Sequence, residues 1–257
     1  MTKVALIPYK MSSEGAKKVA TALQIPMIQD VVDFGGRGTF LINWGCGILP
    51  ARPKPNTRII NKPEAVSTAI NKLHLFRAPN TFSRPPHTEI RDTAKAWIYL
   101  GKTVCARTRV EGCDGAGLVV VSPQNYQDIG GMPEARLYTE FIPCDKEYRA
   151  HVAFGKVIAY QIRAKKSGWQ GGDDRVRTSS NGYGFNVPDD IPESVTVAAL
   201  ACFKEFELDF MALDILYNSE TEKAYVLEFN SAPEMTPYTT TKYCEAFRSV
   251  ITDGEQV

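Results

Sequence analysis

Three oxygen-bearing side chains in the last third of the chain have the types and spacing of a cation site. Glu228 and Asn230 lie two residues apart in one apolar run, and Asp214 lies in the preceding run. Alternate residues of a strand point to the same face, so Asp214 on a partner strand can lie opposite the other two. Two carboxylates in such apolar surroundings need protons, a basic partner or a cation. Mg²⁺ suits such oxygen donors and leaves part of its shell for water and phosphates.

The segment that carries these side chains is predicted to be an antiparallel hairpin. Apolar runs at 210–216 and 224–229 flank a polar connection at 218–223. An amphipathic helix predicted over 192–206 precedes the hairpin, and a small helix predicted over 241–251 follows it.

A glycine-rich connection is a second candidate site. It joins β-rich runs at 102–109 and 118–122, and its glycines are Gly112, Gly115 and Gly117. The amides of such a loop can wrap a phosphate, with Arg107 supplying charge from the preceding strand. Glycine-rich hairpin loops without a ligand are at least as common, so the loop alone does not decide whether a phosphate binds here.

A strand interrupted by proline is a third candidate. Residues 137–142 are apolar enough for a strand that Pro143 ends, and an alternating run follows from Glu147. The unpaired backbone groups at such a break can read the polar rim of an adenine ring. The alternative is that Glu140 and Glu147 only face solvent.

The longest stretch without periodicity, 165–190, is predicted to be a lid or a substrate-binding loop. Its basic cluster could hold phosphates or an acidic substrate, and disorder with solvated charges is the equal alternative. The cluster consists of Arg163, Lys165, Lys166, Arg175 and Arg177.

The first half of the chain is predicted to hold a small α/β lobe and the start of a larger unit. Strands are expected at 4–8, 30–34 and 39–44, and a helix is expected from Asn61 to Leu75. The division that follows is 1–60, 61–135 and 136–257.

Composition narrows the class of protein. The chain has 257 residues, 30 basic against 29 acidic side chains, and six widely spaced cysteines without a CxxC pair. This balance gives no global field for nucleic acid, and the cysteine spacing argues against zinc or disulfide frameworks. No run is long enough for a membrane helix, and the N-terminus lacks a signal-peptide pattern. We therefore expect a cytoplasmic protein without a membrane partner; homo-oligomerisation is left open.

Together these segments resemble the ATP-grasp superfamily over about residues 58–240. The blocks that carry the resemblance are NKPEAVSTAINKLHLFRAPNTF, TVCARTRVEGCDGAGLVVV, TEFIPCDKEYRAHVAFGKVIAYQIR, MALDIL and YVLEFNSAP. The last is similar to the family's Glu-x-Asn-x-x-Pro strand. The resemblance implies an α+β fold in which two α+β subdomains clasp ATP, with a pre-ATP-grasp lobe at 1–60. D-alanine:D-alanine ligase and the ribosomal-protein glutamate ligases have the most similar motifs.

The resemblance also implies roles for individual residues. Asp214, Glu228 and Asn230 match the ligands of Mg²⁺ (or Mn²⁺), and Glu147 matches the carboxylate that holds the ribose. The other nucleotide contacts it implies are Lys62, Arg107, Gly112, Gly115, Gly117, Glu140, Phe141 and Ile142. Arg107 stands where the family usually has a lysine, and the two are not interchangeable at a tight site. Arg163 and Arg107 are the expected catalytic cations.

The expected activity is that of an ATP-dependent ligase, which activates a carboxylate as an acylphosphate and joins it to an amine. A phosphotransferase of the same fold and a non-catalytic ATP-binding protein are the alternatives. The short first lobe with its INWG motif also resembles compact bacteriophage members, which would place the protein in the host cytoplasm.

Overall fold

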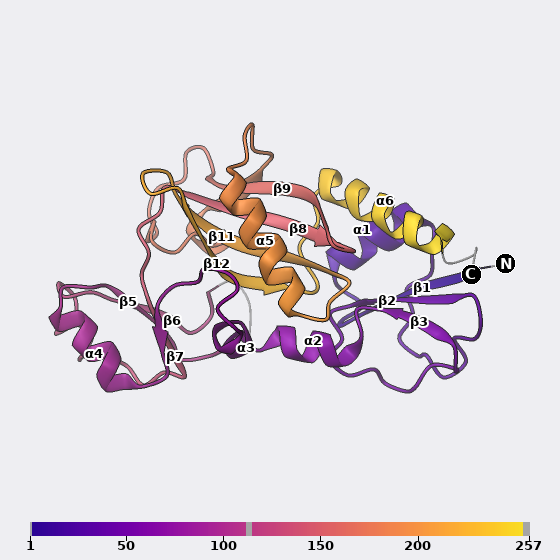
Figure 1. The fold of residues 1–257 in the computed structure, drawn as a ribbon, viewed down its shortest axis with the longest axis horizontal. Coiled ribbons are helices and arrows are strands. Elements are labelled where there is room, and N and C mark those ends of the chain that lie inside the picture. Colours follow the sequence, from indigo (N-terminus) through magenta and orange to yellow (C-terminus); the bar gives the residue numbers. More distant parts are fainter. Residues whose placement is uncertain (1, 112–114, 254–257) are drawn as a thin grey trace.

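The computed structural model describes residues 2–111 and 115–253, which form three sheets with helices packed against them (Figure 1). Gly112, one of the predicted phosphate-loop residues, lies outside the described residues. No helix in the described ranges is both long and apolar enough to cross a membrane.

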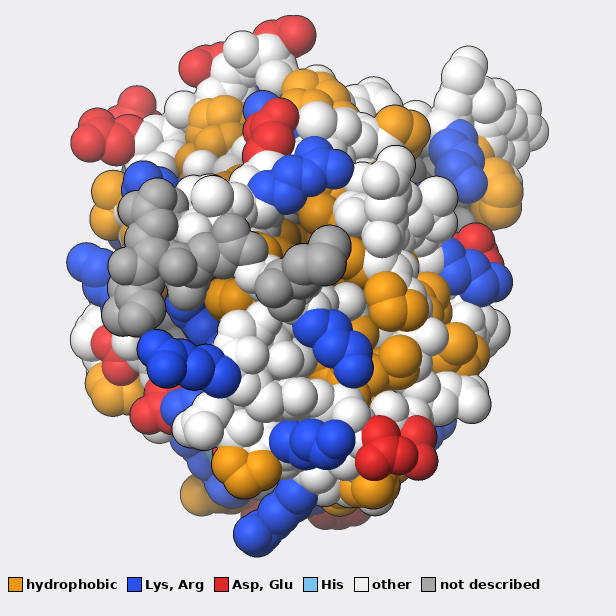
Figure 2. Space-filling model, turned by 90° about the vertical axis from the view of Figure 1, so that its right-hand side faces the viewer, with side chains coloured by type: hydrophobic (Ala, Val, Ile, Leu, Met, Phe, Trp, Pro, Cys, Tyr) orange, Lys and Arg blue, Asp and Glu red, His pale blue; other side chains and the backbone are white. Residues whose placement is uncertain are grey.

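The N-terminal lobe is a parallel three-stranded sheet in the order β1-β2-β3, with α1 against it. Its elements are β1 (Lys3–Pro8), α1 (Glu14–Leu23), β2 (Thr39–Trp44) and β3 (Thr57–Ile60). The N-cap Ser13 accepts a hydrogen bond from Ala16 N, which starts α1 as its sequence predicts. On the face of this lobe, charged side chains of both signs are interspersed with apolar ones (Figure 2).

An antiparallel four-stranded sheet in the order β4-β7-β5-β6 forms one wall of the site. Its elements are β4 (His87–Thr88), α4 (Arg91–Tyr99), β5 (Val104–Arg107), β6 (Leu118–Val121) and β7 (Leu137–Glu140). Two short helices, α2 (Pro63–Ile70) and α3 (Lys72–Arg77), lead into it. Because β7 pairs with β5, Leu137–Glu140 belong to this sheet.

An antiparallel five-stranded sheet in the order β10-β9-β8-β11-β12 forms the other wall. Its strands are β8 (Lys146–Ala153), β9 (Lys156–Lys165), β10 (Tyr183–Asn186), β11 (Phe210–Asn218) and β12 (Lys223–Asn230). The helix α5 (Glu193–Glu205) packs on one face of this sheet, where its Val195, Ala199 and Cys202 are buried (Figure 1). The opposite face of the five-stranded sheet is turned toward the four-stranded sheet, and residues of both sheets line one cavity.

Four sequence expectations differ from the structure. Residues 30–34 form turns instead of a strand. The helix expected over 61–75 is broken at Asn71, whose side chain accepts a hydrogen bond from Leu73 N and thereby caps α3. The stretch 165–190 contains the 3₁₀ turn Ser179–Asn181 and the strand β10. The final helix, α6 (Pro237–Asp253), is longer than expected because its apolar face packs against α1 and the N-terminal core (Figure 1).

Candidate nucleotide and metal site

A cavity of about 600 Å³ lies between the four-stranded and five-stranded sheets. It brings together most of the residues that the sequence singled out. These are Arg107, Gly115, Glu140, Phe141, Ile142, Glu147, Arg163, Asp214, Glu228 and Asn230. Two predicted residues, Gly117 and Lys62, do not line it.

The three predicted metal ligands lie on the cavity-facing side of β11 and β12. Asp214 is the cross-strand neighbour of Glu228, as predicted, and Asn230 lies opposite Ala212. A β-bulge interrupts the pairing after Asp214, so Leu227 has no partner on β11 and lines the cavity beside Glu228. A bulge of this kind turns side chains toward a site, and no sequence pattern predicted it.

Arg149 on β8 is the partner of Asp214. Its Nε and Nη2 donate hydrogen bonds of 2.6 and 2.7 Å to the two carboxylate oxygens, and both side chains are buried. Burial by itself would raise the pKa of Asp214, but the Arg149 guanidinium outweighs it and holds this pKa below its ordinary value. A buried carboxylate can be stabilised by a proton, a basic partner or a cation. For Asp214 the structure supplies a basic partner.

Glu228 has a basic neighbour that the sequence analysis missed. The Lys72 Nζ lies 3.4 Å from the Glu228 Oε2, and Lys72 is the first residue of α3. The predicted lysine, Lys62, instead lines a separate pocket of the N-terminal lobe with Arg52 and Glu64. Both lysines follow an asparagine at a helix start, so the second Asn-Lys pair was the signal that could have identified Lys72.

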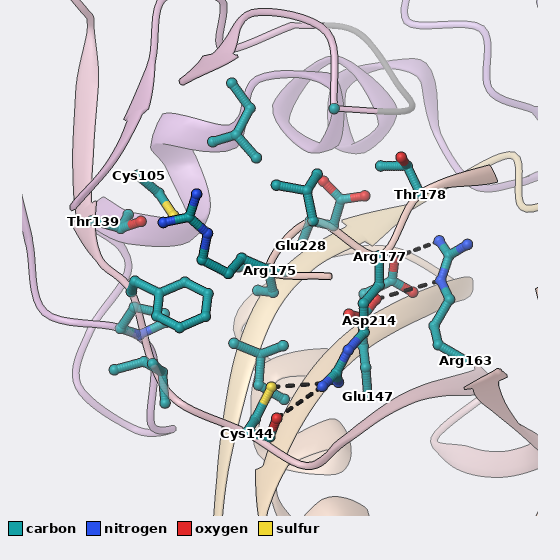
Figure 3. Close-up of a pocket in the computed structure, with 18 of the residues that line it drawn as sticks. Cys105, Thr139, Cys144, Glu147, Arg163, Arg175, Arg177, Thr178, Asp214 and Glu228 are labelled. Atoms are coloured by element: carbon teal, nitrogen blue, oxygen red, sulfur yellow. Dashed lines mark hydrogen bonds and ion pairs between the residues drawn. The ribbon is translucent and has the colours of Figure 1, made fainter. Parts of the chain in front are cut away.

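Glu147 and Arg163 lie next to the buried pair. The Arg163 Nε is 3.4 Å from the Glu147 Oε1, and its Nη2 is 3.7 Å from the Asp214 Oδ2 (Figure 3). Burial and the neighbouring Asp214 charge raise the pKa of Glu147 to about 7, and Arg163 opposes this shift. This carboxylate therefore changes charge near neutral pH, although it was predicted only as a ribose contact.

The end of β7, where the sequence predicts an adenine edge, lines the cavity with Glu140, Phe141 and Ile142. The Phe141 N–H donates to the Thr103 carbonyl at 2.8 Å, and the Glu140 side chain pairs with Lys102 at 2.7 Å. Apolar side chains from both walls line the cavity here, including Ile142 and Leu227. An apolar cavity wall with a few polar groups is typical of a small-molecule site.

Arg107 and the glycine connection belong to the four-stranded wall, as β7 does, and lie across the cavity from the sheet with the predicted metal ligands. Arg107 is 8% exposed, and its buried Nε has no hydrogen-bond partner in the described residues. A buried guanidinium with an unsatisfied donor in a cavity wall favours an anion. Gly115 and Gly117 have φ of +73° and +76°, a conformation that other residues rarely adopt, so glycine is required at this turn.

The long loop between β9 and β10 covers the cavity. Arg177 reaches from this loop to Cys144, where its Nη2 donates to the carbonyl at 2.8 Å (Figure 3). A Cβ on Gly115 would lie only 3.2 Å from the Thr178 Cγ2, so this loop also meets the glycine turn. Asp174 connects the loop to the two strands that flank it. Its Oδ1 lies 2.7 Å from the Lys165 Nζ and accepts a hydrogen bond of 3.0 Å from the Tyr183 hydroxyl.

The donor set is compatible with a divalent cation. A carboxylate offers about four lone-pair positions, and the two hydrogen bonds from Arg149 leave the remainder of Asp214 available. Glu228 and the Asn230 amide oxygen complete a set of hard oxygen donors. In the ranges that the structure describes, no cluster of three or more His, Cys, Asp or Glu side chains has metal-binding geometry, so such a site would depend on Asn230.

The whole chain is similar to solved ATP-grasp ligases. The PsnB ligase complexed with a minimal precursor has a TM-score of 0.68 at 11% identity, covering 98% of this chain and 99% of that chain. D-alanine–D-alanine ligase from Bacillus anthracis has a TM-score of 0.62 at 13% identity, covering 99% and 96%. The Chryseobacterium gregarium RiPP-associated ATP-grasp ligase, complexed with ADP and a leader and core peptide, has a TM-score of 0.65 at 13% identity, covering 98% and 97%.

Other comparisons give no match. No protein-family model and no curated protein matches the sequence. The expected bacteriophage origin has no support among the matched structures. At such low identity the structural matches establish the architecture alone, and they agree with the three-sheet arrangement and the cavity between its walls. The chain has the ATP-grasp fold, as its sequence motifs predicted.

Proposed function

We propose that this protein is an ATP- and Mg²⁺-dependent ligase that activates a carboxylate as an acylphosphate and joins it to an amine. One observation carries the proposal. A single cavity is lined by apolar side chains beside the end of β7, by Arg107 with its unsatisfied buried donor, and by the oxygen set of Asp214, Glu228 and Asn230. The fold shared with ATP-grasp ligases supports the same reaction class.

Charge neutralisation is the main task of the site. Transfer of the γ-phosphoryl group to a carboxylate brings two anions together, so the barrier falls where fixed positive groups face them. Arg107 and the amides of the glycine turn would bind the phosphates. Asp214, Glu228 and Asn230 would hold Mg²⁺, which supplies further positive charge to the phosphates when bound.

Arg163 would face the transferred group from the metal end of the cavity. It is held between two carboxylates at 3.4 and 3.7 Å without hydrogen-bond geometry to either, so its donors remain available to an anion. The β9–β10 loop would exclude water from the acylphosphate through its contacts to Cys144 and the glycine turn.

A peptide is one candidate substrate. PsnB and the Chryseobacterium gregarium ligase are each complexed with precursor or leader and core peptides, and D-alanine–D-alanine ligase represents the small-substrate alternative. Peptides with Asp or Glu side chains therefore belong in the substrate panel beside free amino acids and polyamines.

The test is phosphate release from Mg²⁺ and ATP in the presence of paired carboxylates and amines. We expect release to require both partners and a mass spectrum of the product to show loss of water between them. A stable phosphorylated product without an amine would assign the protein as a phosphotransferase. Absence of ATP binding by calorimetry would overturn both assignments.

A further inference from the structure

The aromatic ring of Phe185 lies against two of the cavity's guanidinium groups. Phe185 is on β10 and is the cross-strand neighbour of Arg163 on β9. Its ring centroid lies 4.1 Å from the Arg163 Cζ and 4.3 Å from the Arg149 Cζ. These are the two shortest cation-to-ring distances among the described residues. Both arginines line the cavity, whereas Phe185 does not.

This ring stands at the end of a row of charged residues that crosses the five-stranded sheet. Arg163 lies opposite it on β9. Arg149 on β8 lies opposite Gln161 and is therefore diagonal to Arg163, and Asp214 on β11 and Glu228 on β12 continue in register from Arg149. The row thus leads from the strand that follows the long loop to the proposed metal ligands.

Carboxylates alone do not fix the direction of Arg163. Its ion-pair distances to Glu147 and Asp214 are long, and its buried Nε has no hydrogen-bond partner in the described residues. An arginine side chain has several rotatable bonds, so attraction without directional bonds leaves it free to turn. The Phe185 face supplies the missing constraint, because a guanidinium stacks flat on a ring, and the attraction grows when the pair is desolvated.

Arg149 differs in this respect. Two hydrogen bonds already fix it on Asp214, so the ring adds to an orientation that exists without it. The ring also lets two like charges lie close together, since each is attracted to the π-system of the ring while the surrounding carboxylates offset their repulsion. Loss of the ring therefore affects Arg163 more than Arg149.

We propose that Phe185 is a positioning residue, which directs the Arg163 guanidinium toward the phosphoryl group that is transferred. The proposal rests on the proposed ligase function, because it refines the role of Arg163 in the same cavity. It contrasts with a role in packing alone, which would change stability without a specific effect on turnover.

Three variants separate these roles. Phe185→Leu removes the π-face and keeps apolar bulk, and Phe185→Tyr keeps the ring. Phe206→Leu is the matched control, because its ring packs on Phe229 at 4.4 Å and does not line the cavity. For Phe185→Leu we expect kcat to fall about tenfold, the size of a lost desolvated cation–π contact, with KM for ATP changed less than threefold. Phe185→Tyr should stay within about twofold of the wild type.

A second measurement is independent of turnover. Ring currents should shift the Arg163 Nε–Hε resonance, assigned by its disappearance in Arg163→Lys, and this shift should vanish in Phe185→Leu and persist in Phe185→Tyr. If the wild type turns over no substrate pair, the ligase proposal fails, and this resonance still decides whether Phe185 orients Arg163.

Two outcomes would overturn the positioning role. One is an unchanged Arg163 resonance, or a kcat within about twofold of the wild type, in folded Phe185→Leu. The other is a parallel loss of kcat and Tm in Phe185→Leu and Phe206→Leu without rescue by tyrosine, which would assign packing alone.

Discussion

Arg149 and Asp214 form a buried, bidentate ion pair between neighbouring strands of the five-stranded sheet. Each charge alone would be costly at this depth, and each compensates the other. The pair therefore belongs to the fold as well as to the proposed metal site, and substitutions should separate these contributions.

Arg149→Met should lower the free energy of unfolding by about 3–5 kcal/mol, because it leaves the buried Asp214 without its hydrogen-bonded partner and with only the longer contact to Arg163. The double variant with Asp214→Leu should recover most of this loss, since apolar residues of similar volume often replace a buried pair without cost. Urea denaturation measures both. The control is Arg77→Met, which breaks an exposed pair with Glu89 and should cost far less, because solvent screens that pair. Equal losses at the two pairs would contradict the assigned burial effect.

Glu147 should make the protein less stable as pH rises from about 4.5 to about 7. Its folded-state pKa of about 7 lies above its ordinary value of 4.5, so the folded state holds a proton that the unfolded state releases in this range. Burial lowers the pKa of His151 to about 4, which adds an opposite trend between pH 4 and 6.5. Subtracting the curve of Glu147→Gln from that of the wild type isolates the first trend. A flat difference curve would show that the Glu147 pKa is not raised.

Lys72 and Lys62 offer a direct test of which lysine serves the site. Lys72→Met should reduce ATP turnover at least tenfold. The Lys72 ammonium lies 3.4 Å from Glu228, so the substitution removes a positive charge that would face the phosphates. Lys62→Met changes a residue of the separate N-terminal pocket and should leave turnover within about twofold. Steady-state phosphate release measures both variants, and the reverse ranking would restore the expectation drawn from the sequence.

Asn230→Ala should abolish turnover while the fold is retained, because the proposed metal set loses one of three oxygen donors. We expect a loss of at least about 100-fold at saturating ATP, and partial recovery with Asn230→Asp at higher Mg²⁺. EDTA should stop the wild-type reaction, and excess Mg²⁺ should restart it. Circular dichroism controls for folding; normal ATP hydrolysis by folded Asn230→Ala would refute the metal assignment.

Arg177→Ala should uncouple ATP consumption from product formation. The substitution removes the contacts of the long loop to Cys144, so water should reach the acylphosphate more often. The ratio of phosphate released to ligated product should rise several-fold. Lys166→Ala, an exposed change in the same loop, is the control and should keep the wild-type ratio. An unchanged ratio in Arg177→Ala would show that this contact does not seal the cavity.

Local signals explain what the sequence predicted well. The hairpin of β11 and β12 follows from alternating apolar runs around a polar connection, and this pattern also placed Asp214 opposite Glu228. The glycine turn follows from backbone conformations that only glycine adopts easily. The family motifs then predicted the fold and most of the named residues that line the cavity.

Contacts between distant segments could not be predicted in this way. The partner of Asp214 lies 65 residues away on β8, and Arg177 meets Cys144 across 33 residues. The β-bulge that turns Leu227 into the cavity has no local pattern, and Lys72 rather than Lys62 approaches Glu228 only because the helix breaks at Asn71. The sequence by itself determined most element types, the glycine turn and the oxygen donors, because these depend on local backbone preferences and residue chemistry. Only the tertiary structure decided which charge compensates which carboxylate, because those pairings form where separate strands and helices pack together.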